Sequence, residues 1–229
     1  MKELKKYEIR QIQINILSTV AKYCDKKGLK YYLAYGTLLG AVRHKGYIPW
    51  DDDIDILMPR PDYELFVINF NKYNKDYKVF AHSNDCNYPC PFAKASYEKT
   101  LLIENTDIKF NKLGVNIDIF PMDGLPESEV EQKKIVNSIT RQRNLLNLKS
   151  ISTSSERIFY KNAILIFGKI ILLFLNYRKI IKRIICKATV FSYEHSKYVG
   201  CLVGNYRYKE VMPKNIFSNQ CKLEFEGKE

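Results

Sequence analysis

Four aspartates within five positions constrain the fold of this chain more than any other feature. They belong to the stretch I-P-W-D-D-D-I-D-I, Ile48 to Ile56, which also contains the only tryptophan. Carboxylates this close repel one another, and each loses hydration if the segment packs against other elements. A fold that includes this stretch therefore needs a compensating positive charge beside it.

Alternation along a strand predicts which of these acids act together. Side chains of a strand point alternately to its two faces, so we expect Asp51, Asp53 and Asp55 on one face and Asp52 on the other. Carboxylates that share a face offer the oxygen ligands that Mg²⁺ prefers, and a bound cation would reverse their repulsion. The alternative interpretation is a solvated turn without a metal.

Two further motifs favour a site for metal and phosphate. Asp118 lies among apolar neighbours in N-I-D-I-F, on a predicted strand where an unpaired acid is costly. We expect it either to reach the same metal or to pair with a Lys or Arg. Gly36 and Thr37 follow another predicted strand at the start of a helix, where backbone N–H groups and a hydroxyl can bind phosphate.

The sequence pattern predicts strands that alternate with helices. Helical spacing covers residues 4–27, 38–43, 59–73 and 128–149, and strand-like segments cover 30–35, 54–58, 77–81, 92–97 and 114–121. We expect Pro121 to end its strand, and Ser128 with Glu131 to form a capping box. This order predicts an α/β (α+β) core over residues 1–150, with a mixed β-sheet flanked by helices.

Residues 151–229 are predicted to form a basic helical segment that completes the same domain after a joint at 151–155. The net charge is +12, and residues 126–229 hold 19 Lys/Arg against 9 Asp/Glu. The apolar run at 163–175 is too short to span a bilayer, which needs about 20 residues. Residues 177–186 form a basic amphipathic helix, which predicts peripheral binding to an anionic membrane surface. A partly buried helical hairpin is the alternative.

The remaining polar residues carry weaker signals. The charged start lacks the apolar segment of a signal peptide, and the six cysteines are scattered, so we expect reduced thiols in a cytoplasmic protein. His82, Cys86 and Cys90 could bind a metal, but their spacing is not a standard zinc pattern and ordinary loop thiols are favoured. His195 is expected at the surface, and Trp50 is expected either to wall the site or to join the core.

A nucleic-acid-binding module is the competing function class, because the pI is about 9.3 and the chain has 17 tyrosines. However, the bases concentrate on an isoleucine-rich helix and are not interleaved with aromatic side chains that could stack on bases. We therefore expect no nucleic-acid partner.

The stretch Y-G-T-L-L-G-A-V-R-H-K-G-Y-I-P-W-D-D-D-I-D-I, Tyr35 to Ile56, resembles the signature of the LicD family. These phosphotransferases are similar in fold to nucleotidyltransferases, and fukutin-related proteins are distant relatives. R-P-D-Y-E (Arg60–Glu64) and I-D-I-F-P-M-D-G (Ile117–Gly124) also fit the pattern, and P-F-A-K (Pro91–Lys94) fits it more loosely. The resemblance covers residues 5–125 well and the remainder thinly.

The resemblance implies roles for particular residues. Asp53, Asp55 and Asp118 would be the catalytic carboxylates that bind Mg²⁺ or Mn²⁺, with Asp51 as a helper. The nucleotide-fold glycine motif would be Gly36 and Thr37, and Arg43 and Lys94 would bind phosphate.

The resemblance also implies a reaction, which is transfer of phosphocholine from CDP-choline to a hydroxyl of a cell-surface glycan or lipid-linked sugar precursor, with release of CMP. The expected location is the inner face of the cell membrane, where lipid-linked sugars are built. The alternative is a nucleotidyltransferase that releases pyrophosphate. Family members usually continue past an F-E-G-like element into a Y-G-D-Y segment, whereas this sequence ends at Phe225–Glu229, so we expect a truncated or naturally short form.

Overall fold

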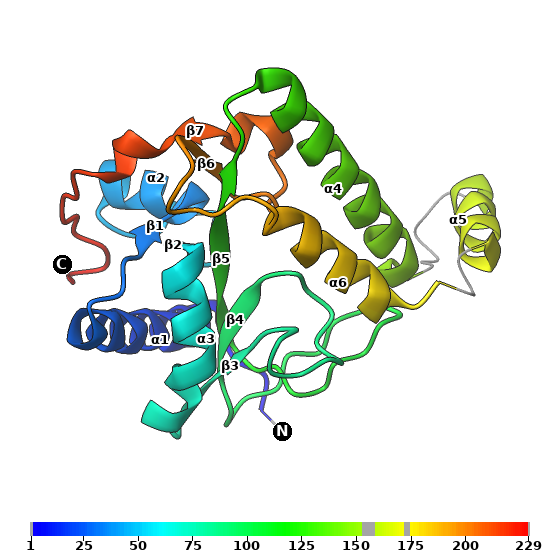
Figure 1. Cartoon of the computed structure of the whole chain (residues 1–229). Coiled ribbons are helices and arrows are strands. Elements are labelled where there is room, and N and C mark those ends of the chain that lie inside the picture. Colours follow the sequence, from blue (N-terminus) through cyan, green and yellow to red (C-terminus); the bar gives the residue numbers. More distant parts are fainter. Residues whose placement is uncertain (1, 153–158, 172–174, 229) are drawn as a thin grey trace.

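A mixed β-sheet forms the centre of the computed structural model, which describes residues 2–152, 159–171 and 175–228 (Figure 1). The strand order is β1-β2-β5-β4-β3, and β6 and β7 extend the sheet from the second half of β5. Strands β2 and β5 pair in parallel, and the other pairs are antiparallel. The expected α/β (α+β) architecture with a mixed sheet is confirmed.

The element bounds follow the predicted pattern with local differences. The strands are β1 (Tyr32–Leu33), β2 (Asp55–Pro59), β3 (Tyr77–Phe80), β4 (Ala93–Tyr97), β5 (Asn116–Leu125), β6 (Tyr198–Gly200) and β7 (Met212–Pro213). The helices are α1 (Lys6–Lys27), α2 (Tyr35–His44), α3 (Arg60–Tyr73), α4 (Glu129–Ser150), α5 (Phe159–Ile171) and α6 (Tyr177–Ala188), with the short 3-10 helices η1 (Arg207–Glu210) and η2 (Lys214–Phe217).

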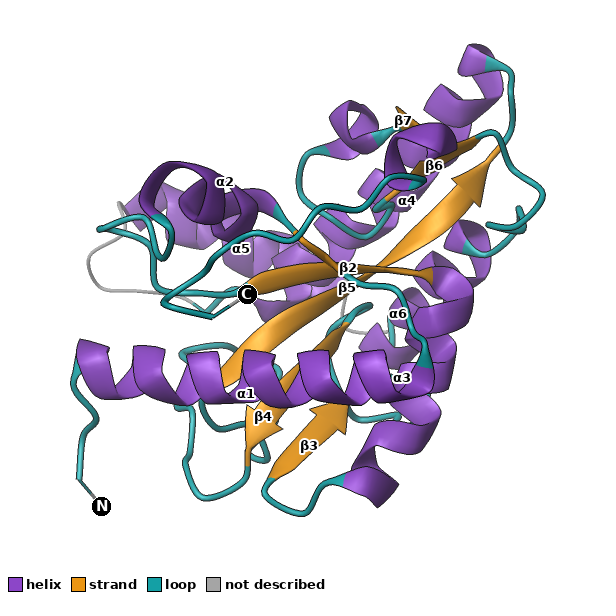
Figure 2. Ribbon diagram, turned by 90° about the vertical axis from the view of Figure 1, so that its left-hand side faces the viewer, coloured by secondary structure: helices purple, strands orange, loops and turns teal. Residues whose placement is uncertain are grey.

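Alternation along the strands divides the core between two faces of the sheet. Ile56, Met58, Ile117 and Ile119 point to the face covered by α1 and α3, and α1 lies across β4 and β5 (Figure 2). Leu57 and Phe120 point to the other face and pack with residues of α4 and α6. Since successive side chains alternate, the acids Asp55 and Asp118 belong to this second face.

Pro121 does not end its strand, contrary to the prediction. The Asp118 N–H donates toward β2, to the Ile54 carbonyl at 2.8 Å, so the backbone of residue 121 faces the opposite side of β5. On that side the pairing with β4 stops at Ile119, and the pairing with β6 starts at Asp123. A proline in this gap sacrifices no ladder hydrogen bond, which explains why β5 continues to Leu125.

Two predicted helix starts also differ from the structure. Ser128 is the N-cap residue of α4, but its side chain makes no capping hydrogen bond, so the predicted capping box is absent. Helix α2 begins at Tyr35 and not at Leu38, and β1 ends at Leu33, two residues before the predicted end of that strand. Gly36 and Thr37 therefore lie in the first turn of a helix.

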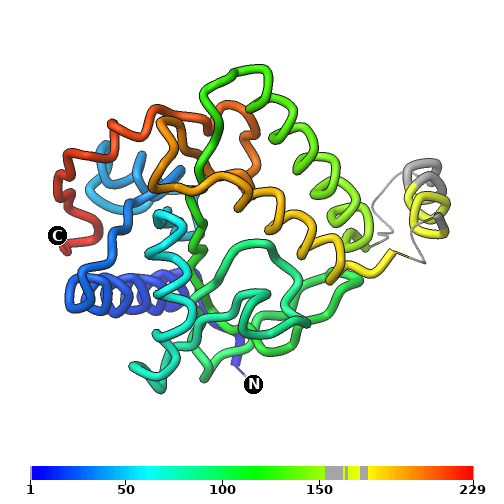
Figure 3. The backbone as a smooth tube through the Cα atoms, viewed as in Figure 1, coloured from blue at the N-terminus to red at the C-terminus, as the bar shows by residue number. Residues whose placement is uncertain are grey.

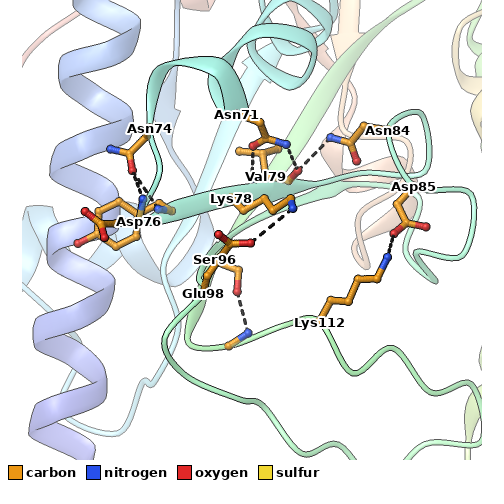
Figure 4. A network of polar contacts seen from close by, with 12 residues as sticks. Asn71, Asn74, Asp76, Lys78, Val79, Asn84, Asp85, Ser96, Glu98 and Lys112 are labelled. Carbon is orange, nitrogen blue, oxygen red and sulfur yellow. Dashed lines mark hydrogen bonds and ion pairs between the residues drawn. The ribbon is translucent and has the colours of Figure 1, made fainter.

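Side chains close the free edge of the sheet at β3 (Figure 4). The Val79 N–H donates to Asn71 Oδ1 at 2.7 Å, and the Val79 carbonyl accepts from Asn71 Nδ2 at 3.0 Å and Asn84 Nδ2 at 2.9 Å. These bonds occupy backbone groups that could otherwise pair with another chain.

Helix α6 packs against α4 and does not present its isoleucines to solvent. Ile180, Ile181 and Ile184 are at most 1% exposed, whereas the bases of the helix at positions 178, 179, 182 and 183 are exposed. The alternative of a partly buried helix therefore describes α6 better than a free amphipathic helix. Most of the predicted joint at 151–155 lies outside the described residues.

The C-terminal residues return to the loop that follows α2 (Figure 3). The Glu226 N–H donates to the Lys45 carbonyl at 2.8 Å, and Glu226 Oε1 accepts from the Tyr47 N–H at 2.9 Å.

Within residues 2–152, 159–171 and 175–228, no helix is long and apolar enough to cross a bilayer.

Candidate active site

Three side chains form a row across neighbouring strands at one end of the sheet. Asp55 of β2 pairs with Asp118 of β5, and Asp118 pairs with Lys94 of β4. Directly paired residues place their side chains on the same face of a sheet. The register therefore brings together two of the predicted catalytic carboxylates and one predicted phosphate-binding lysine.

Lys94 forms an ion pair with Asp118. Its ammonium contacts Asp118 Oδ1 and donates to Asn116 Oδ1 at 3.1 Å, and the side chains of Lys94 and Asp118 are 16% and 17% exposed. Burial alone would lower the pKa of Lys94, but the negative charge of Asp118 leaves that pKa raised, so the ammonium stays charged. The alternative considered for Asp118, a lysine or arginine partner, is therefore present in the structure, and the metal-binding role of Asp118 stays a prediction.

The other acids lie in a loop and not on a strand. Strand β2 begins at Asp55, so Asp51, Asp52 and Asp53 precede it. Carboxylate oxygens of these three residues all lie within 4.8 Å of one another. The prediction that Asp52 points away from its neighbours is therefore wrong, because strict alternation applies only inside a strand.

The electrostatics of Asp53 and Asp55 indicate that Lys94 does not balance the negative charge of the cluster. Burial, followed by the negative charges of Asp53 and Asp118, raises the pKa of Asp55 to about 8. Partial burial and then the charge of Asp51 raise the pKa of Asp53 to about 6. A divalent cation would lower both values by favouring the charged carboxylates, and carboxylate oxygens are suitable ligands for Mg²⁺ or Mn²⁺. The residues present therefore fit such an ion.

Gly36 and Thr37 hold the two acidic segments close to α2. Thr37 Oγ1 accepts the Asp55 N–H at 2.8 Å, in a buried position. A Cβ atom at Gly36 would lie 2.2 Å from Asp51 Oδ2, so only glycine allows the Asp51 carboxylate this approach. The preceding residue, Tyr35, has a φ of 46°, and its hydroxyl donates to Glu210 Oε2 at 2.5 Å.

Arg43 and Trp50 are not packed into the cluster. Arg43 lies in the last turn of α2, at the opposite end of the helix from Gly36, and its side chain is exposed. Its phosphate-binding role stays a prediction. Trp50 is 80% exposed, so the core role considered for it is wrong.

His82, Cys86 and Cys90 are not grouped as the ligands of a metal ion would be. Among the described residues, Asp51–Asp53 is the only group of three or more potential ligand residues close enough to share an ion. His82 Nδ1 lies 3.3 Å from the Tyr88 carbonyl, Cys86 is exposed, and the six cysteines are unpaired. His195 is exposed, as expected.

Two residues of α1 contribute to this site and were missed by the sequence analysis. Arg10 donates to the carbonyl of Asp51, and Gln13 donates to the carbonyl of Asp52. Both lie in a segment whose helical spacing predicted only packing. A polar side chain at an otherwise buried helix position was the one available signal, and Gln13 is only 5% exposed.

Comparisons with known proteins show which family the chain resembles. Residues 28–150 match the family model described as "LicD/FKTN/FKRP, nucleotidyltransferase domain". The whole chain is also similar to the "Lipopolysaccharide cholinephosphotransferase LicD" of Haemophilus influenzae, with 30% identity over 236 residues that cover 86% of that protein. The chain belongs to the LicD family.

Shorter similarities link this LicD family member to uncharacterized proteins of two Rickettsia species. The protein of Rickettsia typhi is 40% identical over 58 residues, which cover 24% of this chain and 19% of that protein. The protein of Rickettsia prowazekii is 41% identical over 58 residues, which cover 24% of this chain and 22% of that protein. The family match includes all the acids of the site and Lys94, whereas α1 precedes it.

Proposed function

We propose that this LicD family member transfers phosphocholine from CDP-choline to a hydroxyl of a cell-surface glycan or lipid-linked sugar precursor, with release of CMP. One observation carries the proposal, namely that Asp55 and Asp118 are paired across β2 and β5 beside the first turn of α2, with Asp53 near enough for its charge to act on Asp55. The similarity of the whole chain to a cholinephosphotransferase supports phosphocholine as the transferred group.

Asp51, Asp53, Asp55 and Asp118 would hold one or two Mg²⁺ or Mn²⁺ ions. Among the described residues, only Asp51, Asp52 and Asp53 already lie close enough together to share an ion, so Asp55 and Asp118 would have to approach the loop acids when an ion binds. When bound, the ion would neutralise charge on the phosphate oxygens of the donor. The raised pKa values of Asp53 and Asp55 support this assignment, because they reveal carboxylates without enough positive charge around them.

The protein's own residues would bind and orient the two substrates. Asp118 is the residue proposed to accept the proton of the acceptor hydroxyl, and Lys94 forms an ion pair with it. The backbone N–H groups at the start of α2, around Gly36 and Thr37, are suited to bind a phosphate oxygen. Direct in-line displacement at phosphorus needs no covalent intermediate with the protein.

The product distinguishes this reaction from that of a nucleotidyltransferase. We expect ³¹P NMR to show Mg²⁺-dependent CMP release when the chain is incubated with CDP-choline and a lipid-linked or lipopolysaccharide-derived acceptor. In a parallel sample with CTP and phosphocholine, we expect no pyrophosphate. Pyrophosphate in the second sample, without CMP in the first, would favour the nucleotidyltransferase.

A lipid-linked sugar acceptor would lie at the membrane, and the exposed positive charge of α6 suits an anionic membrane surface. Both support a location at the inner face of the membrane. The exposed bases of α6 would contact anionic headgroups, with the exposed apolar side chains of α5, Ile166, Phe167 and Ile170, as a second contact. The isoleucines of α6 cannot serve this purpose because they pack in the core.

A further inference from the structure

Arg10 of α1 fixes the path of the acid-bearing loop through its backbone. Its NH2 group donates to the carbonyl oxygens of residues 48, 49 and 51 at 3.2, 3.2 and 2.6 Å. The guanidinium also lies 4.5 Å from the centre of the Tyr47 ring. All three acceptors are main-chain atoms, so these bonds hold the loop and leave the Asp51 carboxylate available.

Gln13, one turn further along α1, connects the loop to the neighbouring strand. Its Nε2 donates to the Asp52 carbonyl at 3.0 Å and to the Asn116 carbonyl at 3.3 Å, and its Oε1 accepts from the Tyr47 hydroxyl at 2.9 Å. Asn116 lies on β5, two residues before Asp118. A single buried amide therefore joins the segment that carries Asp51–Asp53 to the strand that carries Asp118.

The charges of the site explain why such a connection is needed. The loop acids repel Asp55 and Asp118, and this repulsion would drive the loop away from β5 in the absence of a cation. A buried amide without partners would itself be costly, but both amide hydrogens and the carbonyl oxygen of Gln13 have partners. An apolar side chain would pack at this position of α1 at lower cost, so hydrogen bonding accounts for the glutamine.

We propose that Gln13, supported by Arg10, is a positioning residue that sets the spacing between the acid loop and Asp118 and thereby the affinity of the site for a divalent cation. Both residues precede the segment matched by the family model. This inference rests on the metal-binding role given to the carboxylates under the proposed function.

The test measures Mn²⁺ binding to the metal-free full chain, from the electron paramagnetic resonance signal of free Mn²⁺. We expect Gln13→Leu to weaken binding by about 10–100-fold, as for residues that orient metal ligands. Gln11→Leu is the matched control, because Gln11 is exposed and its amide donates to Asn15 on the same helix. This control is expected to bind Mn²⁺ like the wild type.

A double-mutant cycle separates positioning from a general loss of structure. If Gln13 acts by placing the loop relative to Asp118, Gln13→Leu should reduce Mn²⁺ affinity much less in an Asp118→Asn background than in the wild-type background. Equal effects in both backgrounds would overturn the inference, as would unchanged Mn²⁺ affinity in Gln13→Leu. Arg10→Met is expected to weaken Mn²⁺ binding in the same direction, and it decides the question if Gln13→Leu does not fold. A wild-type chain that binds no Mn²⁺ would overturn the proposed function and this inference together.

Discussion

Asp55 is held through its backbone, and its carboxyl is buried among other acids. Its N–H donates to Thr37 Oγ1, and its carboxyl is buried between the charges of Asp53 and Asp118. The residue itself is only 9% exposed. At the scale of single residues, the site therefore depends on how α2 approaches this one position, and two substitutions in the first turn of α2 test that dependence.

Replacing Gly36 with alanine separates stability from function. The new Cβ atom would displace the Asp51 carboxylate, whose Oδ2 lies 2.2 Å from its position. Alanine is favoured over glycine within a helix by up to about 1 kcal/mol, so urea unfolding should show no loss of stability. Mn²⁺ affinity and CMP release are expected to fall by at least about tenfold, as for other ligand-orienting residues. Unchanged Mn²⁺ affinity in a folded variant would contradict the close approach of Asp51.

Replacing Thr37 with valine removes the acceptor of the Asp55 N–H. An unpaired buried donor costs about 1–3 kcal/mol, so we expect a loss of this size in the free energy of unfolding. Thr37→Ser keeps the hydroxyl, so its free energy of unfolding should fall much less. Equal losses in the two variants would show that the methyl group, and not the hydrogen bond, matters at this position.

At the scale of elements, β5 organises the site because it pairs on both sides. Its register with β2 and β4 aligns Asp118 with Asp55 and Lys94. The alternating sequence predicted this strand and its acid among apolar neighbours, and the acid was expected to reach the same metal if its strand lay next to β2. The roles of Arg10 and Gln13 were not predictable, because they depend on backbone carbonyls up to 103 positions away. Local pattern also misplaced the start of β2 and the end of β5, which sheet pairing determines.

The buried row of charges predicts how the metal-free protein responds to pH. The pKa of Asp55 is about 8 in the folded chain, above the value of 3.8 for an unperturbed carboxyl. Between these values the folded state binds more protons than the unfolded state, so stability falls as pH rises. EDTA keeps the protein metal-free. Under this condition, the free energy of unfolding measured with urea should fall less between pH 5 and pH 8 for Asp55→Asn than for the wild type. Mg²⁺ should stabilise the wild type more at pH 8 than at pH 6. Identical pH slopes in both proteins would contradict the raised pKa of Asp55.

At the scale of the whole molecule, positive and negative charge occupy different regions. The acids gather at the sheet end near α1 and α2, whereas the exposed bases of α6 lie on the helix that covers α4. The sequence predicted this separation and the amphipathic character of α6. It did not reveal that α4 and the core bury the isoleucines, because a helical pattern does not identify the partner of its apolar face.

The α6 bases predict electrostatic attraction to membranes. Each base near an anionic surface contributes about 1 kcal/mol, so Lys179→Glu with Lys182→Glu should weaken binding to phosphatidylglycerol vesicles by at least about tenfold. Sedimentation with vesicles at low and high salt measures this effect, and high salt should abolish the difference. The control is Lys72→Glu with Lys75→Glu, two exposed lysines on and just after α3. If the α6 and α3 double substitutions weaken vesicle binding equally, the attraction depends on the net charge of the protein and not on α6.

In the proposed function, carboxylates from two neighbouring strands and one loop form a metal-dependent phosphotransfer site. The most direct measurement is CMP release from CDP-choline, with Mg²⁺ and an acceptor, by Asp55→Asn and by the control Asp76→Asn, whose acid pairs with Lys99 away from the cluster. We expect Asp55→Asn to lose at least about a thousandfold in rate, equivalent to about 4 kcal/mol, while the control retains wild-type activity. A folded Asp55→Asn protein that releases CMP at the wild-type rate would contradict the account.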